Sequence, residues 1–345
     1  MRTLIKTTTI LIFGSFFILA ACETPKPEES TEIQQPSVDP TLEELNKAIL
    51  DAPNDPNNYV RRANYYIENN QIEQAFGDFK LALIADSTRS DIYYQRAQLF
   101  YNQGAIPEAT ADCDRCITHN ASETDCLLML GEINIHLKQY GIAFDKINAA
   151  LEVNEQLPFA YYMKGRIYKE TGDTTLAASS YQTAIEVDPD YYDAYIEVAL
   201  LYASAKSDLA LEYYTTAIEI RPASVEARYN KAIYLQDTGF KDKTRYNSAF
   251  KLYDEILEID PQNATAAYNK GYIYLEYMQK YDSAGMAFTQ AIEIYPGYFQ
   301  AYYNRGLCYE SLNKPQLALE DYSNALKLQP AFDAAAIAKS RVLGN

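Results

Sequence analysis

The chain has 345 residues, of which 48% are apolar and 22% charged, a composition typical of folded globular proteins. Acidic residues outnumber basic ones by 47 to 30, which gives a formal net charge of −17. This charge disfavours binding to nucleic acid phosphates and to anionic lipid. Only two histidines are present, so few side chains suit acid–base or histidine–metal chemistry near neutral pH.

The first 21 residues have the features of a bacterial export signal. Arg2 and Lys6 precede the apolar stretch 10–21, which is too short to span a bilayer. The small residues at the end of this stretch, with Cys22 directly after them, resemble the lipobox of bacterial lipoproteins. The resemblance implies that residues 1–21 are removed and that acyl chains on Cys22 anchor the protein to a membrane. An ordinary signal peptide with a chance cysteine is the alternative.

Residues 22–40 contain four prolines among Glu, Ser, Thr and Gln and show no apolar periodicity. This composition predicts a flexible tether that holds the folded part away from the membrane. Glu23 follows the cysteine, in place of the Asp that resembles an inner-membrane retention signal. We therefore expect an outer membrane lipoprotein of the bacterial cell envelope that faces the periplasm. Exposure at the cell surface is the alternative.

The body of the chain repeats small residues at a nearly constant interval. The first series is spaced mostly by 34 residues and consists of Ala63, Ala97, Gly131, Gly165, Ala199, Ala232, Gly271 and Gly306. Because two antiparallel helices approach closely only where side chains are small, each copy predicts a pair of packed helices. Prolines mark the turn to the next copy at Pro189, Pro222, Pro261, Pro296 and Pro330.

This pattern resembles the tetratricopeptide repeat (TPR), a 34-residue helix–turn–helix unit. The resemblance implies an all-α fold, a right-handed superhelical solenoid of antiparallel helix pairs. We expect an N-terminal half repeat at 41–55, eight full units at 56–332 and a C-terminal capping helix at 333–345. The Trp of the family pattern is mostly replaced by Tyr, and it is lost at Arg228 and Ala267.

The sixth unit is longer than the others because of an enlarged turn at 240–246. Lys241, Lys243 and Arg245 make this turn basic in an otherwise acidic chain. A solvent-exposed insertion is the leading interpretation, and a docking site for a partner is the alternative.

The family resemblance implies a concave groove, lined by the first helices, that binds partner proteins. The residues expected to face a partner are Tyr94, Tyr162, Tyr229, Asn230, Tyr268, Asn269, Tyr303 and Asn304. Tyrosine offers stacking area with a hydroxyl group, and asparagine can pair with a peptide backbone. Acidic residues stand at the second position of four units, namely Asp91, Asp125, Asp193 and Glu226. These carboxylates favour a basic partner segment. The alternative is that the Tyr and Asn residues only pack the repeats.

Cys113 and Cys116 form a CxxC motif, and Ile117 after it excludes covalent haem attachment. Both cysteines stand at packing positions of a second helix, so buried core cysteines are the leading interpretation. A disulfide that includes Cys126 is one alternative, because an envelope compartment is oxidising. A zinc or redox site that also includes His119 is another.

The sequence contains no phosphate-binding glycine-rich loop, nucleophile elbow or HExxH motif, so we expect no enzymatic activity, no cofactor and no metal. Chaperone-binding TPRs that clamp a C-terminal carboxylate need Lys and Arg where Tyr229, Gln300 and Asn304 stand, which excludes that function. The sequence favours a noncatalytic, lipid-anchored adaptor for partner proteins or peptides that assists an envelope assembly, secretion or cell-wall machine. A surface-exposed receptor for a glycan or host ligand is the alternative. The oligomeric state stays open.

Overall fold

The computed structural model describes residues 40–344. The predicted signal, the anchor Cys22 and nearly all of the predicted tether lie outside the described residues. The described part consists of helices and turns and contains no strand, which confirms the all-α prediction. None of its helices is both long and apolar enough to cross a membrane.

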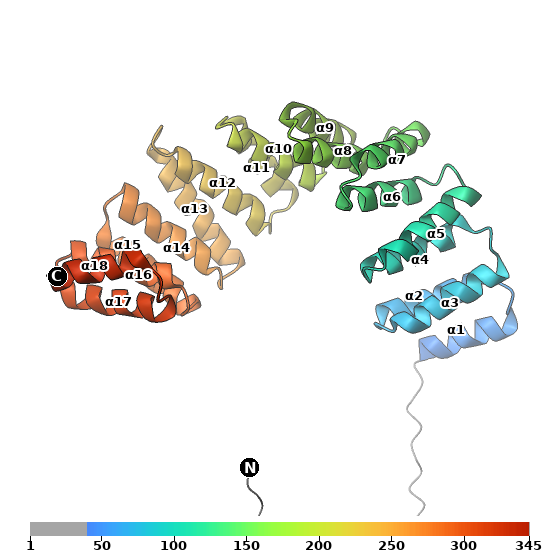
Figure 1. Cartoon of the computed structure of the whole chain (residues 1–345), viewed down its shortest axis with the longest axis horizontal. Coiled ribbons are helices and arrows are strands. Elements are labelled where there is room, and N and C mark those ends of the chain that lie inside the picture. Colours follow the sequence, from blue (N-terminus) through green and yellow to red (C-terminus); the bar gives the residue numbers. More distant parts are fainter. Residues whose placement is uncertain (1–39, 345) are drawn as a thin grey trace, which may run out of the picture.

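Consecutive helices form antiparallel pairs that follow one another along an arch (Figure 1). The α-helices are α1 (Pro40–Asp51), α2 (Pro56–Glu68), α3 (Ile72–Ala85), α4 (Ser90–Asn102), α5 (Ile106–His119), α6 (Thr124–His136), α7 (Tyr140–Val153), α8 (Pro158–Thr171), α9 (Thr174–Val187), α10 (Tyr192–Ser204), α11 (Leu209–Ile220), α12 (Val225–Thr238), α13 (Thr244–Ile259), α14 (Ala264–Tyr272), α15 (Tyr281–Ile294), α16 (Phe299–Ser311), α17 (Pro315–Leu328) and α18 (Asp333–Leu343). A π-helical segment, η1 (Ile273–Tyr277), continues α14. The pairs run from α2/α3 to α16/α17, and α1 and α18 lie at the two ends.

Within a pair, a small residue of the first helix lies under a large side chain of the second. A Cβ atom added to Gly165 would lie 2.5 Å from the ring of Tyr181, and one added to Gly306 would lie 2.6 Å from the ring of Tyr322. Both distances are far below van der Waals contact, so the helices come this close only because no side chain intervenes. The small-residue series of the sequence therefore marks the helix contacts.

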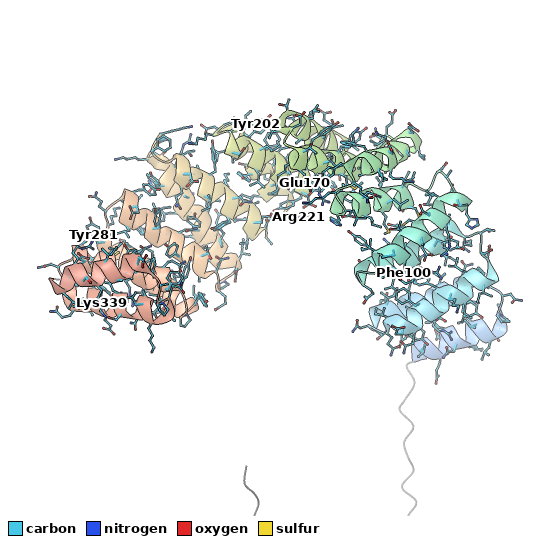
Figure 2. The ribbon with its side chains drawn as sticks, viewed as in Figure 1. Phe100, Glu170, Tyr202, Arg221, Tyr281 and Lys339 are labelled. Carbon is cyan, nitrogen blue, oxygen red and sulfur yellow. A yellow bond between two sulfur atoms is a disulfide. The ribbon has the colours of Figure 1, made fainter. Side chains whose placement is uncertain are left out.

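Between pairs, aromatic side chains fill the layer. The rings of Phe76 and Phe100 stack with centroids 4.4 Å apart, and the centroids of Phe250 in α13 and Tyr274 in η1 are also 4.4 Å apart (Phe100 is labelled in Figure 2). Stacked aromatic pairs stabilise by about 0.5–1.5 kcal/mol beyond the area that they bury. The 32 tyrosines of the chain thus contribute largely to packing.

Three buried ion pairs, which were not predicted from the sequence, each join the two helices of a unit. Each joins an Arg of the first helix to an Asp sixteen residues later: Arg62–Asp78, Arg96–Asp112 and Arg305–Asp321. The Asp side chains are at most 4% exposed, and each Arg contacts both carboxylate oxygens. Removal of one partner would leave a buried charge alone.

The turn within a unit places one residue in the left-handed backbone region. Gly104 and Gly172 occupy this position in two units with φ of 74° and 89°, whereas Asn70, Lys138 and Asn313 occupy it with φ between 56° and 58°. Backbone bonds close each turn, for example from the Gln139 amide to the Asn134 carbonyl at 2.8 Å.

We expect Lys138→Gly to stabilise the third unit by about 0.5–1 kcal/mol, because a side chain disfavours the left-handed region more than glycine's freedom in the unfolded chain costs. Urea unfolding monitored by circular dichroism measures the change. Lys80→Gly is the matched control, since Lys80 lies inside α3, where glycine should destabilise by about 1 kcal/mol. If the two substitutions changed the stability equally, the left-handed backbone at Lys138 would not be the cause of the gain.

Cys116 of α5 and Cys126 of α6 form a disulfide with a Cα–Cα distance of 6.5 Å. Cys116 is buried, as the leading interpretation predicts, but it is not free: it forms the disulfide with Cys126 that was the alternative, because the end of one unit brings it within bonding distance of the start of the next. Cys113 and Cys308 are buried free thiols, as that interpretation predicts for Cys113. Burial raises the pKa of the Cys113 thiol to about 12, which keeps it protonated.

The enlarged turn of the sixth unit packs against the fifth unit. Arg245 donates to both carboxylate oxygens of Asp208 at 2.9 and 2.7 Å, and it also donates to the Thr238 hydroxyl. Tyr246 is buried and stacks on Tyr277 with centroids 4.7 Å apart. The interpretation as a wholly solvent-exposed insertion is therefore wrong for Arg245 and Tyr246.

The Asp208 contact predicts a pH dependence. Hydrogen bonds from Arg245 and Tyr234 lower the pKa of Asp208 to about 2, below its ordinary value. A lowered pKa in the folded state stabilises the protein above the ordinary pKa, and this contribution is lost as the pH falls through the folded value. We therefore expect Asp208→Asn to lower the melting temperature at neutral pH, and the difference from wild type to vanish between about pH 4 and pH 2. A difference that does not change with pH would contradict the assignment.

Candidate partner-binding groove

First helices of successive units lie side by side on the inner face of the arch. In the cyan and green arm, α4 and α6 lie on the inner side, and α5 and α7 lie on the outer side (Figure 1). Direct contacts join α6 to α8 and α10 to α12. First helices of neighbouring units therefore share a surface from α6 to α8 and again from α10 to α12.

The N-terminal half of this surface contains a cavity of about 230 Å³ between α4, α6 and α8. Its walls include Tyr94, Tyr101, Phe159 and the carboxylates of Asp125 and Glu132. Aromatic walls beside carboxylates suit a cationic side chain, through both ion pairing and cation–π attraction.

The C-terminal half contains a second cavity of about 410 Å³, formed mainly by α10, α12 and η1. Asn230, Tyr234, Asp237 and Tyr277 line it, with Lys206 at its edge. Burial raises the pKa of Asp237, although Lys206 opposes the shift. In the described part of the chain, no donor is bonded to the Asp237 carboxylate, so it is free to accept one from a ligand.

Each predicted groove tyrosine packs partly against neighbouring residues and is partly exposed to solvent. All five are half-buried: Tyr94, Tyr162, Tyr229, Tyr268 and Tyr303. The ring centroid of Tyr268, for example, lies 5.5 Å from that of Phe288 in α15 and 4.8 Å from that of Tyr298, which directly precedes α16. Burial raises the pKa of Tyr94 and of Tyr268 to about 12, so both hydroxyls stay protonated and can donate to a partner.

The three predicted asparagines differ from one another. Asn304 is 7% exposed and donates its amide to the hydroxyl of Tyr268 at 2.8 Å, and Asn269 is 8% exposed and donates to Tyr229 at 3.4 Å. These bonds join neighbouring units and occupy donors that the sequence analysis assigned to a partner. Asn230 is half-buried and lines the second cavity.

Most acidic residues of the groove have partners within the protein. Three have partners: Asp91 with Arg89, Asp193 with Arg221, and Glu226 with the hydroxyl of Tyr192. Asp125 is exposed and forms no ion pair or hydrogen bond with any residue from 40 to 344. Of the four carboxylates, Asp125 is therefore the one available to a basic partner.

Models of the tetratricopeptide repeat family match residues 160–191, 264–298 and 299–332. The chain is a tetratricopeptide repeat protein. The family and the fold predicted from the repeat spacing are thus confirmed.

Two curated proteins and one solved structure illustrate what this TPR protein resembles. Mouse BBSome complex member BBS4 is 26% identical over 144 residues, which are 42% of this chain and 27% of that protein. The human mitochondrial import receptor subunit TOM70 is 26% identical over 178 residues, 48% of this chain and 28% of that protein. The chain therefore matches little more than a quarter of the length of these relatives.

The crystal structure of the C-terminal part of a TPR repeat-containing protein from Cytophaga hutchinsonii aligns with 81% of this chain, and the alignment includes 98% of that crystallised chain. Its TM-score is 0.51 and its sequence identity is 17%. This likeness shows a shared fold.

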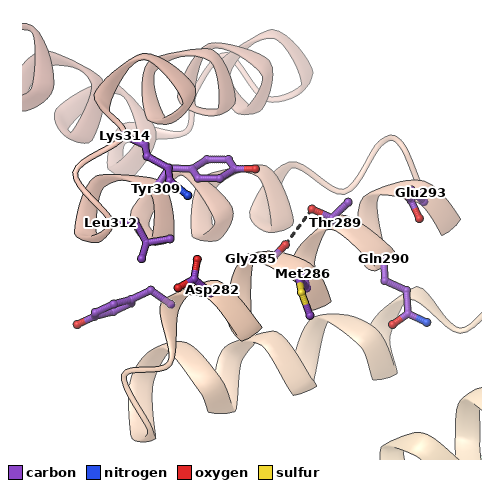
Figure 3. A pocket seen from close by; sticks show the side chains of 10 residues that line it. Asp282, Gly285, Met286, Thr289, Gln290, Glu293, Tyr309, Leu312 and Lys314 are labelled. Atoms are coloured by element: carbon purple, nitrogen blue, oxygen red, sulfur yellow. Dashed lines mark hydrogen bonds between the residues drawn. The ribbon is translucent and has the colours of Figure 1, made fainter.

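The TPR array also carries a cavity away from the predicted groove residues, and this cavity was not predicted from the sequence. It has a volume of about 320 Å³ and lies between α15 and the turn from α16 to α17 (Figure 3). Gly285 and the 72% exposed Met286 form one wall, and Tyr309 and Leu312 face them. Gly285 could have indicated this cavity in the sequence, because most other units carry a larger residue at the equivalent position.

Proposed function

We propose that this TPR protein is a noncatalytic, membrane-anchored adaptor that binds segments of partner proteins along its inner face. The observation that carries the proposal is the surface formed by first helices, with two cavities that each hold a carboxylate beside tyrosines, Asp125 in one and Asp237 in the other. Neither carboxylate has an ion-pair or hydrogen-bond partner among residues 40–344. Such cavities fit the Lys or Arg side chains of an extended basic segment. The spacing of the cavities over several units favours a partner segment over a small molecule.

The disulfide supports a location outside the cytoplasm. Structural disulfides persist in oxidising compartments such as the bacterial periplasm and are rare in the cytosol. Cys116–Cys126 therefore agrees with export, which the first 21 residues also predict. Anchoring through Cys22 and assistance to an envelope assembly, secretion or cell-wall machine are part of the proposal.

The relatives support the binding role. The mouse relative is a member of a complex, and the human relative is a receptor subunit, so both work together with other proteins. By analogy, we infer that the array presents binding surface and that its clients carry out the chemistry.

Photo-crosslinking in intact cells tests the groove. A photoreactive residue in place of Gln98, which lines the first cavity, should form adducts with one or a few discrete proteins. The same residue in place of Ile84, which is 70% exposed on α3, is the control and should give none of these adducts. Equal adducts from both positions would overturn the proposal, and an absence of protein adducts would favour the glycan receptor. In the same cells, the anchor predicts that Cys22→Ala moves the protein from the membrane fraction to the soluble fraction.

Charge reversal in the two cavities should weaken capture. We expect Asp125→Lys with Asp237→Lys to reduce the Gln98 adducts by roughly tenfold, because two attractive charges become repulsive ones. Asp145→Lys with Glu258→Lys is the matched control, since it changes the net charge equally at exposed positions of second helices. If the control pair reduces the adducts as much as the cavity pair, only net charge matters and the cavity assignment fails.

A further inference from the structure

The two ends of the array are complementary halves of one unit. In every full unit a first helix is covered by a second helix of its own. The helix α18 stands at the position of a first helix, because Ser340 follows Gly306 by one repeat length of 34 residues. The helix α1 stands at the position of a second helix, because Ala48 precedes Ala82 by the same 34 residues.

At the C-terminal end, α18 exposes the surface that a second helix covers elsewhere. Ser340 is exposed, whereas the small residue at its position is buried in all eight full units. A cavity of about 520 Å³ surrounds it, lined by Ala336, Ile337, Ser340 and Arg341. Ile337 is 66% exposed. In the preceding unit the ring of Tyr322 lies over Gly306, and among the described residues no side chain does the same for Ser340.

At the N-terminal end, α1 lacks a first helix of its own within the described residues. It packs on α2 of the following unit, where Leu45 is buried. Ala48 is half-exposed, although Ala82, Ala184 and Ala325 at the same position are fully buried. The uncovered side of α1 is therefore the side that a first helix covers in a full unit.

We propose that a second copy of this chain binds end to end, with α1 of one copy packed on α18 of the other. The pair would complete a unit in which the partly exposed side of α1 at Ala48 packs on the exposed face of α18 at Ile337 and Ser340. The charges agree, because α1 carries three acidic residues and one basic residue, whereas α18 carries two basic residues and one acidic residue.

This contact is heterologous, since two different surfaces meet, and each added copy leaves both kinds of end free. The association therefore continues beyond a dimer into a filament, or it closes into a ring. Peptide binding in the groove does not require it, so this proposal stands apart from the proposed function.

Sedimentation velocity of the purified full-length chain over a concentration series tests the proposal. We expect the average mass to rise with concentration beyond twice the monomer mass of 39.1 kDa. A monomer at all concentrations, as would result if upstream residues covered α1 within one chain, would overturn the proposal. A dimer that does not grow would also overturn it.

End-blocked variants identify the surfaces. Ser340→Arg fills the cavity of α18, and Ala48→Arg blocks the open side of α1, so each variant alone should remain a monomer. A mixture of the two retains one intact contact and should form a dimer and nothing larger. Ser179→Arg, at an exposed serine of α9, is the control and should associate as the wild type does. Circular dichroism confirms folding of each variant, and association of either blocked variant alone would refute the assignment.

Discussion

Arg305→Met is expected to lower the free energy of unfolding of the last unit by about 3–5 kcal/mol, the usual cost of leaving one member of a buried ion pair alone. Arg305 binds both carboxylate oxygens of Asp321 at 2.8 Å, and the Asp321 side chain is only 3% exposed. Burial already raises the pKa of Asp321, and the hydrogen bonds from Arg305 oppose that rise. Without Arg305 the carboxylate must be buried unpaired or take up a proton.

Each unit of a solenoid contacts only its neighbours, so the loss is expected to appear locally. Hydrogen exchange measures it: the amides of α16, α17 and α18 should exchange faster, while those of α2 to α9 should keep their wild-type rates. The difference should shrink at acidic pH, because a raised pKa favours the neutral carboxyl in the folded state.

The double variant Arg305→Met, Asp321→Leu is the control for this prediction. With both charges replaced by apolar groups of similar size, most of the lost stability should return. If the double variant is no more stable than the single one, the buried charge is not the cause of the loss.

Tyr181→Ala should destabilise the fourth unit by about 3–5 kcal/mol, the cost that is typical of deleting a large buried aromatic side chain. Tyr181 is fully buried, and its ring fills the space over Gly165 and lies 5.5 Å from Tyr162. No small residue nearby can move into the vacated volume, because the helices are already in close contact at the glycine. Urea unfolding measures the loss.

Tyr181→Phe provides the matched comparison and should act in the opposite direction. The Tyr181 hydroxyl is buried and has no hydrogen-bond partner in residues 40–344. Its removal should stabilise by about 1 kcal/mol, because an unpaired buried polar group is costly. At the same position of the last unit, the Tyr322 hydroxyl donates to Glu310 at 2.8 Å, so Tyr322→Phe should destabilise by about 1 kcal/mol. The same sign for both Phe variants would contradict this explanation.

The repeat spacing was sufficient to predict the helices and their contacts. Ala63, Gly165 and Gly306 recur because close approach of two helices requires a small residue, a requirement that acts within one unit. The Arg305–Asp321 pair was missed because acidic residues are abundant in the chain, and a sixteen-residue spacing between opposite charges does not stand out. The left-handed turn was also not predicted. Glycine marks this position in only two units, whereas a unit such as the third has Lys138 there.

The groove was predicted less completely than the fold. The sequence placed Asn269 and Asn304 toward a partner, whereas the structure binds their amides to tyrosines of the preceding unit. Such bonds depend on side-chain conformation and on the distance between residues 40 and 36 positions apart in neighbouring units, and a periodic pattern contains neither. Partner contact through the groove tyrosines, Asn230 and Asp125 remains a prediction.

The disulfide gives the array an uneven response to mechanical load. A solenoid that is pulled at its ends lengthens like a spring, because the interfaces between units bend and then open one after another. Cys116 and Cys126 tie the second unit to the third across such an interface, and they are only ten positions apart in the sequence. Under tension this junction keeps its alignment while the others yield, so a load transmitted along the chain deforms the units on either side of the tie first.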